Sequence, residues 1–187
     1  KELYPKLNNE SYFLIVIDNL RYDQWLIIKP LIEELFDIEK EEIYCSILPT
    51  TTQYARNSLF SGLMPLEIKN KFPDKWVDED ENEGKNLHEE FFLNENLKRN
   101  SITGKFSYNK ITNLSKGKKL LSNFNNLLQN NLNTIVYNFV DTLSHARSEM
   151  EVIKELAEDE SAYRSLTLSW FKHSPLYEMM KRMSERS

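Results

Sequence analysis

The feature that most constrains the fold is an apolar run near the start of the chain that stops at a carboxylate. Phe13 to Ile17 are consecutive apolar residues, and Asp18 follows them directly. Such a run predicts a strand buried on both faces, as in a parallel sheet that helices cover. Ligands bind at the carboxyl edge of such sheets. Asp18 therefore has two interpretations, a metal or substrate ligand and a cap for the next helix.

A second segment, Ile43 to Leu48, is interpreted as another strand, either alternating or buried, which Pro49 ends. Thr50 to Thr52 then supply hydroxyl groups at the start of a predicted helix. The positive field and the unpaired N–H groups of a helix N-terminus favour both deprotonation of a hydroxyl and phosphate binding. These threonines are candidates for a nucleophile, and ordinary helix capping is the alternative.

A third run, Ile135 to Val140, predicts a strand that ends at Asp141, and His145 follows after three further residues. This spacing allows the two side chains to converge on one metal ion. Carboxylate oxygen and imidazole nitrogen suit zinc, and also manganese or iron. The alternative is a helix cap at Asp141 and a surface histidine at 145.

These residues stand in an order that resembles the alkaline phosphatase superfamily. The resemblance is based on three motifs: D-x-x-R (Asp18, Arg21), P-T-x-T followed by S-G-L-x-P (Pro49, Thr50, Thr52, Ser61, Gly62, Leu63, Pro65) and D-x-x-x-H (Asp141, His145). More narrowly, VIDNLRYDQW, LPTTTQYARNSLFSGLMP and NFVDTLSHARSEMEVIKELA resemble the PglZ domain of PorX-type response regulators of Bacteroidetes. The resemblance implies an α/β fold with an alkaline-phosphatase-like parallel sheet flanked by helices, as one domain over residues 1–187.

The resemblance also implies two zinc ions and a threonine nucleophile. Asp18 and Thr52 would belong to one metal, and Asp141 and His145 to the other. Thr52 occupies the position of the second threonine of P-T-x-T, which is the nucleophile in the nucleotide phosphodiesterase branch; Thr51 is the alternative. The threonine would attack phosphorus and form a phosphothreonine, which water would then release.

Three further residues are expected to contact the phosphate. Asn19 follows Asp18 where many relatives have glycine, so its amide would face the phosphate. Arg21 and Arg56 are candidates because a guanidinium suits bidentate phosphate recognition. For both arginines, a solvated position on a helix surface is the alternative.

The family pattern continues beyond these motifs with an Asp-His pair and a further histidine, which this sequence lacks. His88 and His173 match no family ligand. The chain is therefore expected to be an N-terminal fragment of the domain whose C-terminal part is missing, with a receiver domain and a helical linker upstream. Such a fragment is expected to bind metal weakly or not at all.

Composition narrows the class of protein. The formal charge of −5 argues against a non-specific nucleic-acid coat, though not against an oligonucleotide substrate. The single cysteine, Cys45, lies in a predicted strand, where a small buried hydrophobe is expected, and one cysteine fits the reducing cytoplasm. No apolar run approaches the roughly 20 residues of a membrane span.

The remaining segments carry weaker signals. The acidic run at 78–83 predicts a solvated loop, and residues 123–133 predict the end of an amphipathic helix that leads into the third strand. Residues 147–186 predict helices, with Ser174 as an N-cap before Pro175. This helical end is open to two interpretations, an insertion in the sheet core and a homodimer surface. Its aromatic and methionine face predicts either a partner or burial (Trp170, Phe171, Met179, Met180, Met183).

Two functions from different classes follow. The first is a metal-dependent phosphodiesterase or phosphatase effector domain of a two-component response regulator, with oligonucleotide or signalling-nucleotide substrates and a link to type IX secretion and gliding. A phosphate-transfer mutase would share its metal site. The second is a catalytically silent output module that contacts other signalling proteins of the pathway.

Overall fold

The computed structural model describes residues 4, 7, 10–77 and 87–186. The predicted acidic loop at 78–83 lies outside them. The chain divides into two compact units, one of residues 1–40 and 105–187 and one of residues 41–104. The first unit holds the sheet, and the second is helical in the part that the structure describes.

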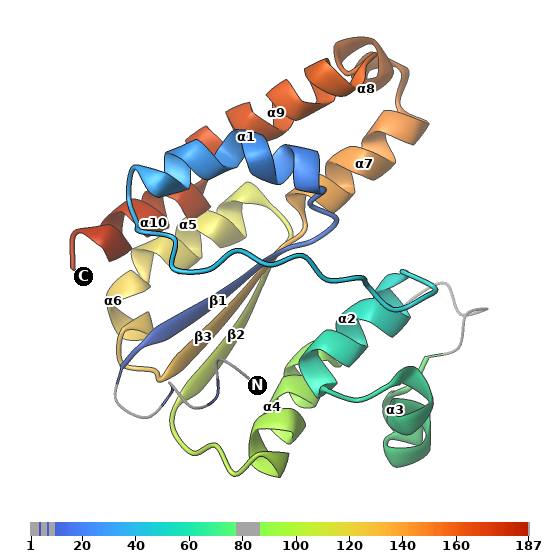
Figure 1. Cartoon of the computed structure of the whole chain (residues 1–187), viewed down its shortest axis with the longest axis vertical. Helices are drawn as coiled ribbons and strands as arrows, with labels where there is room; N and C mark the ends of the chain where they lie inside the picture. The colour runs from blue at the N-terminus through green and yellow to red at the C-terminus, as the bar shows by residue number, and fades with distance from the viewer. Residues whose placement is uncertain (1–3, 5–6, 8–9, 78–86, 187) are drawn as a thin grey trace. The chain divides into compact units, whose positions relative to one another are not determined.

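The sheet of the first unit has three parallel strands in the order β1-β3-β2 (Figure 1). The strands are β1 (Tyr12–Ile17), β2 (Phe106–Ile111) and β3 (Leu132–Tyr137), and Ile17 and Ile111 both align with Tyr137. Their carboxyl ends therefore meet at one edge. This α/β architecture, a parallel sheet flanked by helices, confirms the predicted fold class.

Helices cover the face of the sheet that carries the main core. They are α1 (Tyr22–Glu33), α5 (Leu114–Ser122), α6 (Phe124–Leu127), α9 (Glu160–His173) and α10 (Pro175–Ser184). Two more helices follow β3, namely α7 (Phe139–Glu149) and α8 (Glu151–Leu156). Figure 1 shows α1, α5, α9 and α10 together on one side of the strands.

The predicted aromatic and methionine face of the C-terminal helices is buried inside this unit. Phe171 and Met179 are fully buried, and Trp170 and Met183 pack around the same core cluster as Ile135. The predicted helix end before β3 is confirmed in part, because Phe124 and Leu127 are buried on α6. This helix ends at Leu127, however, and Leu132 is already the first residue of β3. The apolar stripe therefore stabilises the sheet of its own chain.

The second unit is built from α2 (Thr52–Ser61), α3 (Pro65–Lys71), a short 3-10 helix η2 (Pro73–Lys75) and α4 (Glu89–Arg99). Helix α2 packs against α4 and α3. Phe60, Ile68, Phe92 and Leu97 are buried there.

Two strand predictions were wrong, and one strand was not predicted. Residues 43–48 form no strand, and Ile43, Tyr44 and Cys45 are exposed, since no strand pairs with this segment among the described residues. The strand β2, with alternating polar residues, went unpredicted. The third strand runs from Leu132 to Tyr137 and not from Ile135 to Val140, because Asn138 is the N-cap of a helix that begins at Phe139.

The degree of burial also differs from the prediction for the first strand. Every residue of β1 is half-buried, whereas every residue of β3 is buried. The reason is position, because β1 lies at an edge of the sheet and β3 lies between its two neighbours. Full burial on both faces therefore belongs to the central strand.

Candidate metal and phosphate site

Asp18 lies at the carboxyl edge of the sheet, directly after β1. Its backbone N–H donates to the carbonyl oxygen of Tyr137 at 2.9 Å, so the end of β1 stays joined to the end of β3. Its side chain is half-buried and α1 begins only at Tyr22, so Asp18 is not the N-cap of that helix. The position is the one at which parallel sheets bind ligands.

Asn19 adopts a left-handed backbone conformation with a φ of 59°. Glycine reaches this region without steric cost, and asparagine is among the few other residues that visit it routinely. The asparagine therefore occupies a backbone position that would also suit glycine. Its side chain is exposed beside Asp18.

Asp141 and His145 lie one turn apart on α7. The sequence predicted Asp141 at the end of a strand, but Asp141 lies in the first turn of this helix. His145 Nε2 lies 3.7 Å from Asp141 Oδ1, and the side chains are 68% and 30% exposed, respectively. Residues that are four positions apart on a helix have their side chains on the same face, and this spacing brings Asp141 and His145 together.

The fit of this pair to a metal ion is partial. Carboxylate and imidazole are suitable zinc ligands, but zinc sites in proteins use three or four protein ligands. No group of three His, Cys, Asp or Glu side chains able to hold a metal occurs in the part of the chain that the structure describes. Asp141 and His145 thus supply two ligands of a set that the described residues do not complete.

Thr52 is the first residue of α2, and Thr51 is its N-cap with extended backbone (φ −64°, ψ 150°). The predicted helix start at the threonine cluster is therefore confirmed. Thr52 belongs to the second unit, whereas Asp18, Asp141 and His145 belong to the first. A helix of ten residues carries unpaired N–H groups and a positive dipole end at this position.

Arg56 is buried in the second unit and not solvated. Its Nη2 lies 2.7 and 2.8 Å from the two carboxylate oxygens of Glu89 on α4, and the two side chains are 7% and 1% exposed. Removing one partner of a buried ion pair is strongly destabilising. Arg56 therefore joins α2 to α4, and a phosphate would have to compete with Glu89 for its guanidinium.

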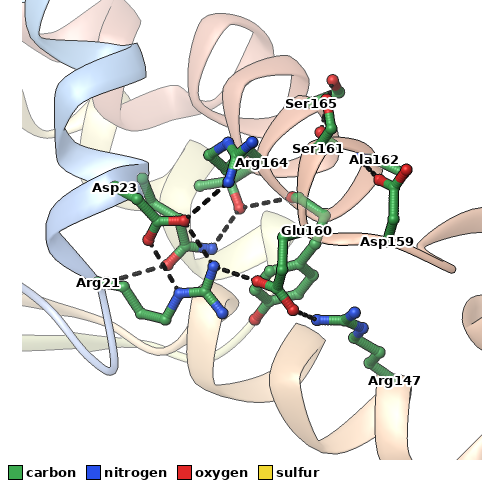
Figure 2. A network of polar contacts seen from close by, with 12 residues as sticks. Arg21, Asp23, Arg147, Asp159, Glu160, Ser161, Ala162, Arg164 and Ser165 are labelled. Carbon is green, nitrogen blue, oxygen red and sulfur yellow. Dashed lines mark hydrogen bonds and ion pairs between the residues drawn. The ribbon is translucent and has the colours of Figure 1, made fainter.

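Arg21 lies at the centre of a network of charged side chains on α1, α7 and α9 (Figure 2). Its Nε and Nη2 donate to the two oxygens of Asp23 at 3.0 and 2.7 Å, and Nη2 also pairs with Glu160. The hydrogen bond from Arg21 lowers the pKa of Asp23 to about 2. The predicted phosphate contact at Arg21 would thus require exchange of a carboxylate for a phosphate.

Two further arginines extend the network. Arg164 on α9 pairs with Asp23 at 3.2 Å, and Arg147 on α7 pairs with Glu160 at 2.7 Å. The guanidinium groups of Arg147 and Arg21 both lie over the ring of Tyr163, at 4.9 and 5.2 Å from its centre. The sequence alone does not reveal this network, because Asp23 and Arg164 are 141 positions apart and meet only in the folded chain.

The chain resembles a known protein family over nearly its whole length. Residues 1–186 match the family model PglZ, described as the BREX system PglZ alkaline phosphatase-like domain. No curated protein matches the chain. Within the described residues, every helix is too short or too polar to cross a membrane. Since the match extends over nearly all of the sequence, this chain belongs to the PglZ family of alkaline phosphatase-like domains.

Proposed function

We propose that this domain is a metal-dependent phosphoester hydrolase that acts on phosphodiesters. The observation that carries the proposal is the Asp141–His145 pair, 3.7 Å apart on the helix that follows the central strand, in a chain of an alkaline phosphatase-like family. The pair supplies oxygen and nitrogen ligands at the edge of the sheet where ligands bind.

Asp141 and His145 would hold one zinc ion, and Asp18 with Thr52 would hold a second. Bound zinc acts as a Lewis acid and lowers the pKa of an oxygen ligand. The remaining ligands of both ions would come from outside the described residues.

Thr52 is the proposed nucleophile. Its Oγ1 would form a bond to phosphorus while the bond from phosphorus to the leaving oxygen breaks, and the proton of the hydroxyl would pass to solvent. Water would then attack the phosphothreonine and return the free hydroxyl. The N-terminal dipole of α2 favours negative charge on the phosphate and on the threonine oxygen.

Asn19 and Arg21 are the proposed phosphate contacts beside Asp18. Asn19 is exposed at the carboxyl edge of β1, and its amide can donate two hydrogen bonds. Arg21 would exchange one of its carboxylate partners for the phosphate. Arg56 is a weaker candidate for the same role, since Glu89 already neutralises it in a buried pair.

The finer biological role is proposed from the resemblance of the sequence motifs. We infer a PorX-type effector domain of a cytoplasmic two-component response regulator, with oligonucleotides or signalling nucleotides as substrates and type IX secretion and gliding as the regulated processes. Other signalling proteins of the pathway and a second copy of the chain are the inferred protein partners.

A second function is a catalytically silent output module, and one observation favours it. The described residues complete no metal site, and carboxylates already engage both candidate phosphate-binding arginines. Such a module would keep the fold and act through contacts with other regulators.

Metal removal separates the two functions. The full protein should hydrolyse bis-p-nitrophenyl phosphate when zinc is supplied and stop when a chelator is added. His145→Ala should weaken zinc affinity by at least about 100-fold, since even partners of metal ligands contribute 10- to 100-fold. His88→Ala, with the same loss of an imidazole in the second unit, should change neither zinc affinity nor rate. If the protein does not hydrolyse the substrate even when zinc is supplied, the catalytically silent output module is favoured.

A further inference from the structure

Positive charge is concentrated in one segment of this acidic chain. Residues 105–140 hold five lysines and no arginine, aspartate or glutamate, and all 29 acidic residues of the chain lie outside this segment. The segment runs from β2 through α5, α6 and β3 to the start of α7. A cleft that is lined by charge of one sign attracts ligands of the opposite sign.

Three of these lysines line a groove of about 550 Å³ between β2 and α5. The polar side chains of its wall come from Asn109, Lys110, Lys116, Lys119, Ser122 and Asn123. Lys116 and Lys119 are exposed, and neither pairs with a carboxylate within the described parts of the chain. No aspartate or glutamate is among the described residues of the wall. The groove is therefore a cationic site.

The packing of α5 determines which way these lysines face. Gly117 and Leu120 are buried on this helix, and a side chain at position 117 would meet the ring of Pro175 on α10 at 3.1 Å. Residues three apart share one face of a helix, so this face of α5 is held against α10. Lys116 and Lys119 are also three apart and share the neighbouring face, which stays exposed.

The groove follows the edge of the sheet. In the described part of the chain β2 pairs with β3 alone, so β2 is an edge strand. Helix α5 begins soon after the carboxyl end of β2 and returns toward the amino ends of the strands, where α6 leads into β3 (Figure 1). The groove therefore leads away from the sheet edge that carries Asp18.

The side chains of the groove suit a chain of phosphates better than a protein surface. Lysine, serine and asparagine are among the residues that bind the phosphate oxygens of nucleic acids. Protein interfaces are depleted in lysine and depend on aromatic anchors, and no aromatic residue is found among the described residues of this wall. Without aromatic rings the groove also offers no platform on which bases can stack.

We propose that this groove binds the sugar-phosphate backbone of a single-stranded nucleic acid, with Lys110, Lys116 and Lys119 paired to its phosphates. The inference deepens the proposed function and rests on it, since the strand held here would be the part of a phosphodiester substrate beyond the bond that is cleaved. Contacts to the backbone alone make this binding independent of base sequence. The groove would thereby favour a polymer over a small diester.

The test is fluorescence anisotropy of the full protein with fluorescein-labelled oligothymidylate, in low salt and with a chelator so that no strand is cleaved. The logarithm of the affinity should fall with the logarithm of the salt concentration with a slope of about −2, as three phosphate contacts on a single strand predict. Lys116→Gln/Lys119→Gln should bring the slope to about −0.7.

The same variants should also differ in affinity. Lys119→Gln should weaken binding by about twofold to fivefold, the range of one exposed ion pair, and Lys116→Gln/Lys119→Gln by about fivefold to twentyfold. Lys154→Gln is the matched control, because it removes the same charge from an exposed position on α8 and should leave the affinity unchanged. All these variants should melt at the wild-type temperature, since glutamine is a good helix former.

Three results would overturn the inference: no binding of oligothymidylate in low salt, wild-type affinity in Lys116→Gln/Lys119→Gln, or competition by poly-glutamate equal to that by unlabelled oligothymidylate of the same total charge. The last result would assign the groove to an acidic protein segment. Binding is measured without hydrolysis, so the two proposals can fail separately. A protein that hydrolyses bis-p-nitrophenyl phosphate but binds no oligothymidylate refutes the groove alone, whereas one that binds the strand and hydrolyses nothing refutes the catalytic function.

Discussion

Asn19 holds the turn between β1 and α1 with a φ of 59°, next to the candidate ligand Asp18. A left-handed conformation costs an ordinary L-residue roughly 1–2 kcal/mol. We expect Asn19→Ala to lower the free energy of unfolding by about 1 kcal/mol, measured by urea denaturation. Asn19→Gly is the matched control, and its free energy of unfolding should equal or exceed that of the wild type. Equal stability of the alanine and glycine variants would contradict the backbone argument.

Asp23 makes the charged network sensitive to acid. Its pKa is lowered to about 2, mainly by the hydrogen bond from Arg21, while an unfolded aspartate titrates near 3.9. A lowered pKa stabilises the folded state above the unfolded value, and this contribution is lost as the pH falls from about 4 to 2. Because the Asp23 carboxylate is 38% exposed, solvent screens its interaction with Arg21, and its contribution to the free energy of unfolding is small.

The measurement for Asp23 is urea unfolding at a series of pH values. Asp23→Asn should show a smaller loss of stability between about pH 4 and pH 2 than the wild type. Asp74→Asn, which removes an exposed carboxylate in the second unit, should keep the wild-type slope. An unchanged slope in Asp23→Asn would show that the pair with Arg21 contributes nothing to folding.

The charged network also shows which residue-scale features sequence could predict. The spacing of Asp141 and His145 is local, and one helical turn brings the two side chains together. Arg21 and Glu160 meet only through the packing of α1 against α9, which no local pattern encodes. The motif could therefore suggest a phosphate contact at Arg21, which stays a prediction, while its pairing with the distant Glu160 could not be predicted.

At the scale of the element, Ser174 joins α9 to α10. Its Oγ donates to the carbonyl of Phe171 at 2.7 Å and accepts from the N–H of Tyr177 at 3.2 Å, and the side chain is buried. Loss of an N-cap side chain typically costs about 1 kcal/mol. Ser174→Ala should lower the free energy of unfolding by about 1–2 kcal/mol, because the freed N–H is buried.

The control for Ser174 is Asp159→Ala at the exposed N-cap of α9, where Asp159 accepts from the N–H of Ala162 at 2.7 Å. Water can replace the hydrogen bond of this exposed cap, so Asp159→Ala should lower the free energy of unfolding by less than Ser174→Ala. Chemical denaturation of both variants gives the comparison. A larger loss for Asp159→Ala would contradict the role assigned to burial of the Ser174 cap.

The Ser-Pro cap of α10 was predictable because capping depends on neighbours in sequence. Strands were less predictable, since a strand exists only where a partner pairs with it. The apolar run at 43–48 has no paired strand among the described residues, whereas the polar β2 is held by β3. Burial similarly depends on the place of a strand in the sheet, which explains why β3 and not β1 is fully covered.

At the scale of the whole molecule, the order of the motifs along the chain predicted the α/β class and the family. Asp18 directly follows β1, as expected from the first apolar run, whereas Asp141 and His145 lie on the helix after β3 and not at the end of the strand. The division of the chain into two units was not predicted, because it depends on the contacts of many residues that are distant in sequence.

The proposed reaction is hydrolysis of phosphodiesters by the full protein with Thr52 as the nucleophile. The most direct measurement is the rate of p-nitrophenolate release from bis-p-nitrophenyl phosphate with zinc present, for the wild type and for Thr52→Val. Loss of a nucleophile should lower the rate by about 1,000-fold or more, whereas Thr51→Val should retain the wild-type rate. Hydrolysis by Thr52→Val at the wild-type rate would show that Thr52 is not the nucleophile.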